Sequence, residues 1–322
     1  MDARLDALEH WLARQLGGVA CRLAPASEDA SFRRYFRAHL ADGRTYVVMD
    51  APPPQEDCAP FVRIAQLLRD AGLHAPEVHA QDLAQGFLLL SDLGTTTYLT
   101  ALQAGDADSL MRDAIDALLR WQLATRAGML PPYDEALLQR EMALFPDWYV
   151  ARHVGRTLSA ERQAELQKIF ALLAASALAQ PRVYVHRDYM PRNLMVSEPN
   201  PGVLDFQDAV TGPITYDVVC LFRDAFLSWD EERVLDWSIR YWERAKKAGL
   251  PVDADFAEFW RALEWMGLQR HLKVAGIFAR LTYRDGKPKY VADTPRFIGY
   301  ARAVAARYAP LAPLVRILDE LS

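Results

Sequence analysis

The order of apolar and polar residues divides the chain into an N-terminal part with strand spacing and a longer part with helical spacing. Apolar and polar positions alternate over residues 32–40, and the β-branched run at 45–49 follows the turn signal Asp42-Gly43. This pattern predicts a β-hairpin. Apolar positions at helical spacing over 58–71 predict a helix, and Gly72 is a natural end for it. The charged N-terminus is typical of an amphipathic helix, and the remaining short strands are expected at 19–24, 77–80 and 87–90.

From Thr97 onward the apolar positions recur mostly at helical spacing. The spacing predicts helices near residues 107–126, 134–153, 159–179, 214–228, 230–248, 254–275 and 293–306. Between 182 and 210 the pattern changes to turns and short strands, with strands expected at 194–197 and 202–204. The sequence therefore predicts an α+β protein, with a small β-rich N-terminal part, a larger helical C-terminal part and one polar, loop-rich segment where function is expected.

Composition narrows the class of protein. The chain has 322 residues, a net charge of -5 and 51% hydrophobic residues, as is usual for a globular protein. This charge gives no reason to expect nucleic acid as a partner, and the apolar runs are too short to cross a membrane. Three scattered cysteines fit reduced thiols better than a disulfide framework. We expect a cytoplasmic protein that is a monomer, with no membrane or nucleic-acid partner.

The polar segment contains the residue types that phosphoryl transfer requires. Asp188 follows His186 and Arg187, and Asn193 and Asp205 come later in the same segment. Transfer from ATP needs a carboxylate at the acceptor hydroxyl and oxygen ligands for Mg²⁺. We predict that Asp188 is the catalytic base and that Asn193 and Asp205 are the metal ligands.

The same motifs carry a family resemblance. The runs V-H-R-D-Y-M-P-R-N-L-M-V and V-L-D-F-Q-D-A, followed by Gly212-Pro213 and Tyr216-Asp217, resemble the aminoglycoside phosphotransferase branch of the protein-kinase-like enzymes. The resemblance implies a protein-kinase-like bilobal fold, with a nucleotide-binding N-lobe at 1–92 and a C-lobe at 93–322 that holds the catalytic loop and the substrate. It also implies ATP and Mg²⁺ as cofactors and a small-molecule substrate.

A narrower resemblance concerns the substrate. Segments 30–37, 49–53 and 266–273 are similar to bacterial kinases that phosphorylate the anomeric hydroxyl of N-acetylmuramate or N-acetylglucosamine. It implies an ATP-dependent sugar kinase in cell-wall recycling. Two alternatives stay open: a kinase of another small hydroxyl compound, such as an aminoglycoside, a choline-like alcohol or an amino-acid alcohol, and a non-catalytic nucleotide-binding homologue.

The nucleotide site departs from the kinase pattern. Strand 45–50 has Met49 or a neighbour where kinases have a phosphate-binding lysine, and helix 58–71 has no glutamate to pair with it. We expect Arg33 or Arg34 to replace the lysine, because the guanidinium fork suits phosphate. Further nucleotide contacts are expected from Ser31 beside these arginines and from Ser91 and Leu93 at the adenine.

Several other polar residues have two interpretations. Asp208 could bond neighbouring amides, or could contact a second metal or the sugar. The run Arg270, His271 and Lys273 could bind a substrate carboxylate or hydroxyl groups, or could form a solvated helix face. We interpret His186 and Asp217 as structural residues, the latter near a helix start.

Overall fold

A computed structural model describes residues 2–28, 32–103 and 107–321. Two compact units emerge from its contacts. The first is Met1–Trp121 with Pro191–Asp208, and the second is Gln122–Met190 with Ala209–Ser322. The first unit contains a five-stranded sheet and the second is mainly helical, which confirms the predicted α+β class. The boundary between two lobes at residue 92 stays a prediction. The two units are defined by contacts between residues, and such a division does not test where one lobe ends.

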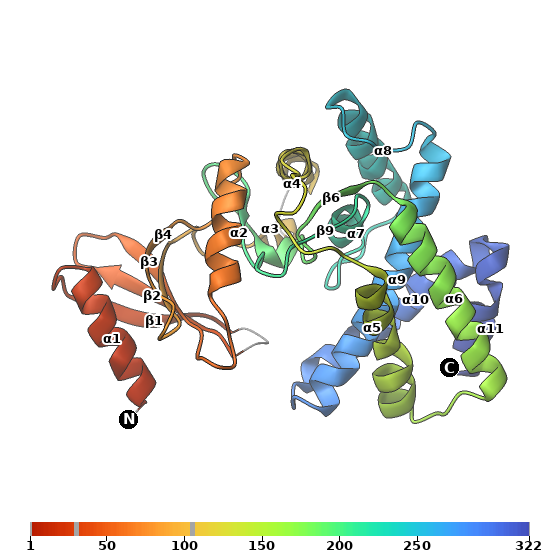
Figure 1. The fold of residues 1–322 in the computed structure, drawn as a ribbon, viewed down its shortest axis with the longest axis horizontal. Helices are drawn as coiled ribbons and strands as arrows, with labels where there is room; N and C mark the ends of the chain where they lie inside the picture. The colour runs from red at the N-terminus through yellow and green to blue at the C-terminus, as the bar shows by residue number, and fades with distance from the viewer. Residues whose placement is uncertain (1, 29–31, 104–106, 322) are drawn as a thin grey trace. The chain divides into compact units, whose positions relative to one another are not determined.

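The sheet of the first unit is antiparallel throughout, with the strand order β1-β2-β3-β5-β4. Figure 1 labels β1 to β4 of this sheet and helix α1 (Ala3–Gln15) beside it. Its strands are β1 (Cys21–Glu28), β2 (Arg34–Leu40), β3 (Thr45–Asp50), β4 (Val78–Asp82) and β5 (Phe87–Ser91). The β2–β3 pair is the predicted hairpin, with Tyr35 opposite Met49.

Alternation along the strands gives the sheet two different faces. Helix α1 (Ala3–Gln15) covers one face and inserts Trp11 and Leu12 against Ala38 and Val48. Tyr35 and Val47 lie at the alternate positions of β2 and β3, so their side chains point to the other face. There they line a pocket. The sheet thus separates an apolar support from a ligand-sized hollow.

The rest of the first unit consists of helices and part of the polar segment. It comprises α2 (Ala59–Asp70), α3 (Tyr98–Leu102), α4 (Ala107–Leu123, which runs into the second unit), η2 (Pro191–Asn193), β7 (Leu194–Met195) and β8 (Gly202–Val203). Strands β7 and β8 pair as a small hairpin. The backbone N–H of Val203 donates to the carbonyl of His74 at 2.7 Å, which ties this hairpin to the chain that follows α2.

The second unit is organised around its longest helix, α9 (Phe256–Tyr283). Its other elements are α5 (Glu135–Leu144), the π-helical η1 (Phe145–Val154), α6 (Ala160–Ala179), β6 (Arg182–Val185), β9 (Val210–Pro213), α7 (Tyr216–Phe222), α8 (Glu231–Lys247), η3 (Pro288–Asp293), α10 (Thr294–Arg307), η4 (Ala309–Leu311) and α11 (Ala312–Glu320). Helix α9 packs against α5, α6, α7 and α10. Gly276 allows the closest approach, because a Cβ there would lie 2.3 Å from the backbone of Leu144.

The predicted elements are present with differences at some ends, and the helix expected over 134–153 is divided into α5 and the π-helical η1. The helix expected over 214–228 ends at Phe222, because the carboxylate of Asp224 accepts the N–H groups of Phe226 and Leu227 and forms a turn. The helix expected over 254–275 continues to Tyr283. No helix in the described part of the chain is long and apolar enough to cross a membrane.

Candidate active site

Asp188 lies in the second unit, on a loop held in an unusual conformation. Arg187, immediately before it, has a φ of 77°, a region that non-glycine residues seldom adopt. Such a backbone costs on the order of 1–3 kcal/mol and persists where surrounding bonds impose it. Here the N–H groups of His186 and Arg187 donate to the two oxygens of Asp217, at 2.7 Å and 3.0 Å.

These bonds favour the structural interpretation of Asp217, but they show that it holds the loop carrying Asp188 rather than its own helix. Its side chain is fully buried in the first turn of α7. Burial raises the pKa of the Asp217 carboxyl to about 7, against the opposing effect of the two N–H donors. The ring of His186 also supports the loop, because its Nδ1 accepts the N–H of Asp188 at 3.2 Å.

A buried ionic network holds the side chain of Arg187. Its guanidinium lies 2.6 Å from an oxygen of Glu141, and the ammonium of Lys273 lies 3.0 Å from the same oxygen. Burial acts to raise the pKa of Glu141, but the two cations prevail and lower it to about 2. Lys273 also donates to the hydroxyl of Tyr216 at 2.9 Å. The predicted substrate contact of Lys273 stays a prediction, and these partners favour a structural role instead.

The two proposed metal ligands lie together in the first unit. The Nδ2 of Asn193 donates to Oδ2 of Asp205 at 3.1 Å. Asn193 ends η2 just before β7, and Asp205 follows β8, so the small hairpin brings them together. Asp205 has a φ of 60° and is, with Arg187, one of two non-glycine residues with positive φ in the described residues. One of these conformations is at a proposed metal ligand, and the other is at the residue immediately before the proposed base.

The donor set of this pair fits Mg²⁺. Residues 2–28, 32–103 and 107–321 contain no cluster of three or more His, Cys, Asp or Glu side chains that could hold a metal. Magnesium, however, is usually bound through one or two carboxylates, waters and substrate phosphates. One amide and one carboxylate meet that need. Asp208 is exposed, and the amide of Gln207 bonds both it and Asp205, at 3.3 Å and 3.0 Å.

A pocket of about 290 Å³ adjoins this pair in the first unit. Asn193 and Asp205 lie at one part of its wall. Ser91 and Leu93, the predicted adenine contacts, also line it. Its apolar walls are formed by side chains from β2, β3, α2, β5 and the segment after β8, namely Tyr35, Val47, Phe61, Leu90 and Leu204.

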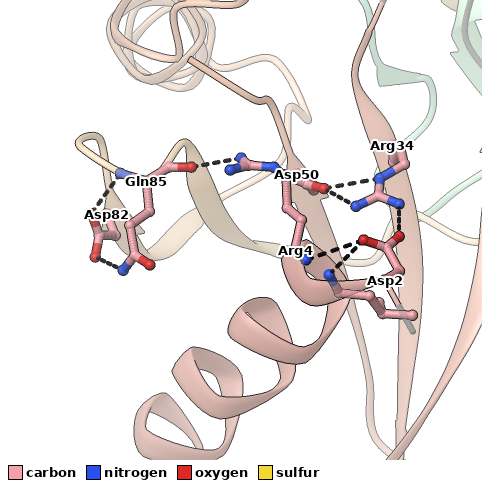
Figure 2. Close-up of polar contacts among 7 residues, drawn as sticks. Asp2, Arg4, Arg34, Asp50, Asp82 and Gln85 are labelled. Carbon is pink, nitrogen blue, oxygen red and sulfur yellow. Dashed lines mark hydrogen bonds and ion pairs between the residues drawn. The ribbon is translucent and has the colours of Figure 1, made fainter. Parts of the chain in front are cut away.

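Arg33 and Arg34 have opposite surroundings. Arg34 lies on the α1 side of the sheet, where it donates to the buried carboxylate of Asp50 at 2.6 Å and 2.9 Å and also pairs with Asp2. Figure 2 shows Asp50 between Arg34 and Arg4, whose Nε donates to it at 2.7 Å. Arg33 instead has its guanidinium 3.9 Å from Oδ1 of Asp205. Arg33, immediately before β2, therefore faces Asp205, one of the two proposed metal ligands.

The remaining predicted contacts fall in different places. Ser31 lies outside the described residues. Arg270 and His271 belong to the second unit, on α9, and both are buried. Sequence reasoning missed Arg37, which lines the pocket and pairs with Asp92 at 2.6 Å. The available signal was the period-2 alternation of Tyr35 and Arg37 along β2, which Arg33 continues just before the strand.

Comparison with known proteins places this arrangement in a family. A kinase from Pseudomonas aeruginosa named N-acetylmuramate/N-acetylglucosamine kinase is 57% identical, over 99% of this chain and 97% of its own. A protein of the same name from Neisseria meningitidis is 50% identical, over 98% and 95% of the two chains.

Solved structures share the fold at low sequence identity. A choline/ethanolamine kinase family protein from Mesorhizobium loti superposes with a TM-score of 0.66 at 15% identity, over 98% of this chain and 99% of its own. The aminoglycoside phosphotransferase APH(2″)-IIa, in a gentamicin complex, gives 0.62 at 15% identity, over 92% and 96%. The fold is therefore the predicted protein-kinase-like one. Because the model of the phosphotransferase enzyme family also matches residues 22–265, the chain belongs to that family.

Proposed function

We propose that this protein is an ATP-dependent kinase that phosphorylates the anomeric hydroxyl of an amino sugar, N-acetylmuramate or N-acetylglucosamine. The observation that carries the proposal is the pairing of Asn193 with Asp205 at 3.1 Å beside a pocket of about 290 Å³. The strained loop before Asp188 supports it. The choice of sugar follows the names of the relatives at 50% and 57% identity, and a role in cell-wall recycling is part of the proposal.

The pocket suits a nucleoside. Tyr35, Val47 and Leu90 offer apolar and aromatic surface for an adenine, and the backbone around Ser91 and Leu93 offers hydrogen-bonding groups. Arg33, 3.9 Å from Asp205, is placed to meet phosphate oxygens with its planar fork. The guanidinium of Arg33 then binds the phosphates in place of the lysine that this sequence lacks.

The transfer step follows from the residues. The sugar hydroxyl attacks the γ-phosphorus of ATP, the bond from that phosphorus to the β-bridging oxygen breaks, and ADP leaves. Asp188 accepts the hydroxyl proton, while Asn193 and Asp205 hold the cation site. Bound Mg²⁺ would neutralise charge on the β- and γ-phosphate oxygens. Asp217 and Glu141 keep the loop in position through backbone and side-chain bonds, so that Asp188 is oriented before the substrate arrives.

A substrate panel tests the proposal directly. The protein is incubated with ATP and Mg²⁺ and, separately, with N-acetylmuramate, N-acetylglucosamine, choline and an aminoglycoside. Phosphorus NMR then reports whether a phosphate is attached and to which carbon. An anomeric sugar phosphate is the expected product. Turnover of choline or the aminoglycoside alone would replace the proposed substrate, and nucleotide binding without transfer to any compound would favour a non-catalytic homologue.

A further inference from the structure

A cluster of cationic and aromatic side chains lies in the second unit, outside the groups used above. It is formed by Arg223 at the end of α7, Arg270 and His271 on α9, and Tyr300 on α10. We call these four residues the Arg223 cluster. Arg223 places its guanidinium 5.3 Å from the ring centroid of Tyr300, and His271 places its ring 5.0 Å from the same centroid.

The two guanidinium groups of the cluster lack a direct ionic partner in the part of the chain that the structure describes. Across the described residues, neither Arg223 nor Arg270 has a carboxylate within ion-pair distance. Arg270 is 1% exposed, and its Nη1 donates to the carbonyl of Arg223 at 3.4 Å. A buried cation without a paired anion is costly. Such a site gains stability when an anion binds.

Two further polar atoms are left without partners at the same place. Among the described residues, the buried Nδ1 of His271 and the buried Oδ1 of Asp224 have no hydrogen-bond partner. Burial and the charges of Arg270 and Arg223 lower the pKa of His271 well below its usual value, so its ring is neutral and can donate or accept. The carboxyl group of Asp224 lies within electrostatic range of Arg270, but among the described residues it forms no ion pair with either arginine.

The cluster is also close to the catalytic loop of its own unit. The carboxylates of Asp188 and Asp224 both raise the pKa of Arg270, against the effect of its burial, which places all three groups within electrostatic range of one another. The Sγ of Cys220, three residues before Arg223, also donates to the carbonyl of Arg187 at 3.2 Å, so the segment that carries Arg223 contacts the loop of Asp188 directly.

Resting on the proposed function, we propose that Arg223, supported by Tyr300 and Arg270, binds the lactyl carboxylate of N-acetylmuramate. This carboxylate is the group that N-acetylmuramate has and N-acetylglucosamine lacks. Guanidinium groups recognise carboxylates through paired hydrogen bonds, and the stack on Tyr300 holds the planar fork in place. Arg223 is then a specificity-determining residue for the acidic sugar and contributes nothing to the neutral one.

The test compares the two sugars in one variant. We expect Arg223→Met to lower kcat/KM for N-acetylmuramate by roughly ten- to a hundredfold, the effect of losing a charged hydrogen bond. The value for N-acetylglucosamine should stay within about twofold, and this sugar also serves as the control for folding. The methyl ester of N-acetylmuramate should be as poor for the natural protein as the free acid is for the variant.

Arg233→Met is the matched control, because Arg233 also stacks on aromatic rings, 5.5 Å from that of Trp229, in the same unit. It should leave the ratio of the two kcat/KM values unchanged. Arg223→Lys, which keeps the charge but loses the fork, should give an intermediate ratio. Equal losses for both sugars in Arg223→Met, or no change for either, would overturn the proposal. If the natural protein phosphorylates neither sugar, the proposed function fails and the carboxylate site fails with it.

Discussion

The backbone N–H of Arg187 donates to Oδ1 of Asp217 at 3.0 Å, at a residue whose φ is 77°. The bond joins the catalytic loop to the first turn of α7, thirty residues later in the chain. A conformation of this kind relaxes when the bonds that impose it are removed. The orientation of Asp188 therefore depends on the Asp217 side chain, which is itself fully buried.

Removing Asp217 should impair catalysis through the loop. We expect Asp217→Ala to lower the free energy of unfolding by about 1–3 kcal/mol, because two buried N–H groups lose their acceptor. The value of kcat should fall by roughly tenfold or more while KM for ATP changes little. Thermal unfolding and steady-state kinetics measure the two effects. A variant as stable and as active as the natural protein would show that the loop holds its own conformation.

Alanine substitutions of Arg33 and of Arg34 should have different effects, one on ATP binding and the other on stability. Arg33→Ala should raise KM for ATP by roughly ten- to a hundredfold, because a charged hydrogen bond to phosphate is lost. Arg34→Ala is the matched variant. It should leave ATP binding nearly unchanged and lower stability instead, because Asp50 keeps only Arg4 as a cationic partner. Calorimetric ATP titration and thermal melting measure both, and the reverse result would assign the phosphate to Arg34.

The buried Glu141 predicts a pH dependence of stability. Its pKa is lowered from the usual 4.5 to about 2, so the folded state binds this proton less readily than the unfolded state. The stabilising contribution is complete above about 4.5 and is lost as the pH falls toward about 2.

Glu141→Gln should lower the free energy of unfolding at pH 7 by on the order of 3 kcal/mol, because Arg187 and Lys273 lose a buried partner. The difference from the natural protein should shrink as the pH is lowered from about 5 to 3. Glu165→Gln is the control, because its pairs with Arg162 and Arg316 lie nearer the surface and should contribute little to stability. A difference that is constant over this range would contradict the assigned ionisation.

The Asn193–Asp205 pair predicts a metal requirement. Activity should disappear in EDTA and return with added Mg²⁺. Asp205→Asn should raise the Mg²⁺ concentration that gives half-maximal activity by roughly tenfold or more, because one ligand loses its charge. Asp82→Asn, in a turn of the same unit, should leave this concentration unchanged. An unchanged metal titration for Asp205→Asn would remove this residue from the site.

Several features of the fold and of the candidate site could be predicted from the sequence, because the residues that determine them are close together in the chain. The Asp42-Gly43 hairpin, the helix that ends before Gly72 and the spacing of Asp188, Asn193 and Asp205 each depend on neighbouring residues only. Strand alternation also separates Arg33 from Arg34 once the helix on one face of the sheet is known.

Other features depend on partners distant in sequence. Glu141 and Lys273 form an ion pair although they are 132 residues apart in the chain. No sequence pattern around either residue predicts this pairing. The same is true of Arg223 and Tyr300, which lie on different helices in the second unit. Arg270, His271 and Lys273 are neighbours in one polar run of the sequence. Their side chains have different surroundings, because a helix turns about 100° per residue.

Single-turnover phosphoryl transfer by the Asp188→Asn variant tests most directly whether Asp188 takes the proton of the sugar hydroxyl. The rate of transfer from radiolabelled ATP to N-acetylglucosamine is measured with enzyme in excess, and ATP affinity is measured separately by calorimetry. We predict a rate lower by about 10²–10⁴-fold, with an ATP Kd within about threefold of the natural value. A transfer rate within about threefold of the natural rate, at unchanged ATP affinity, would contradict the account.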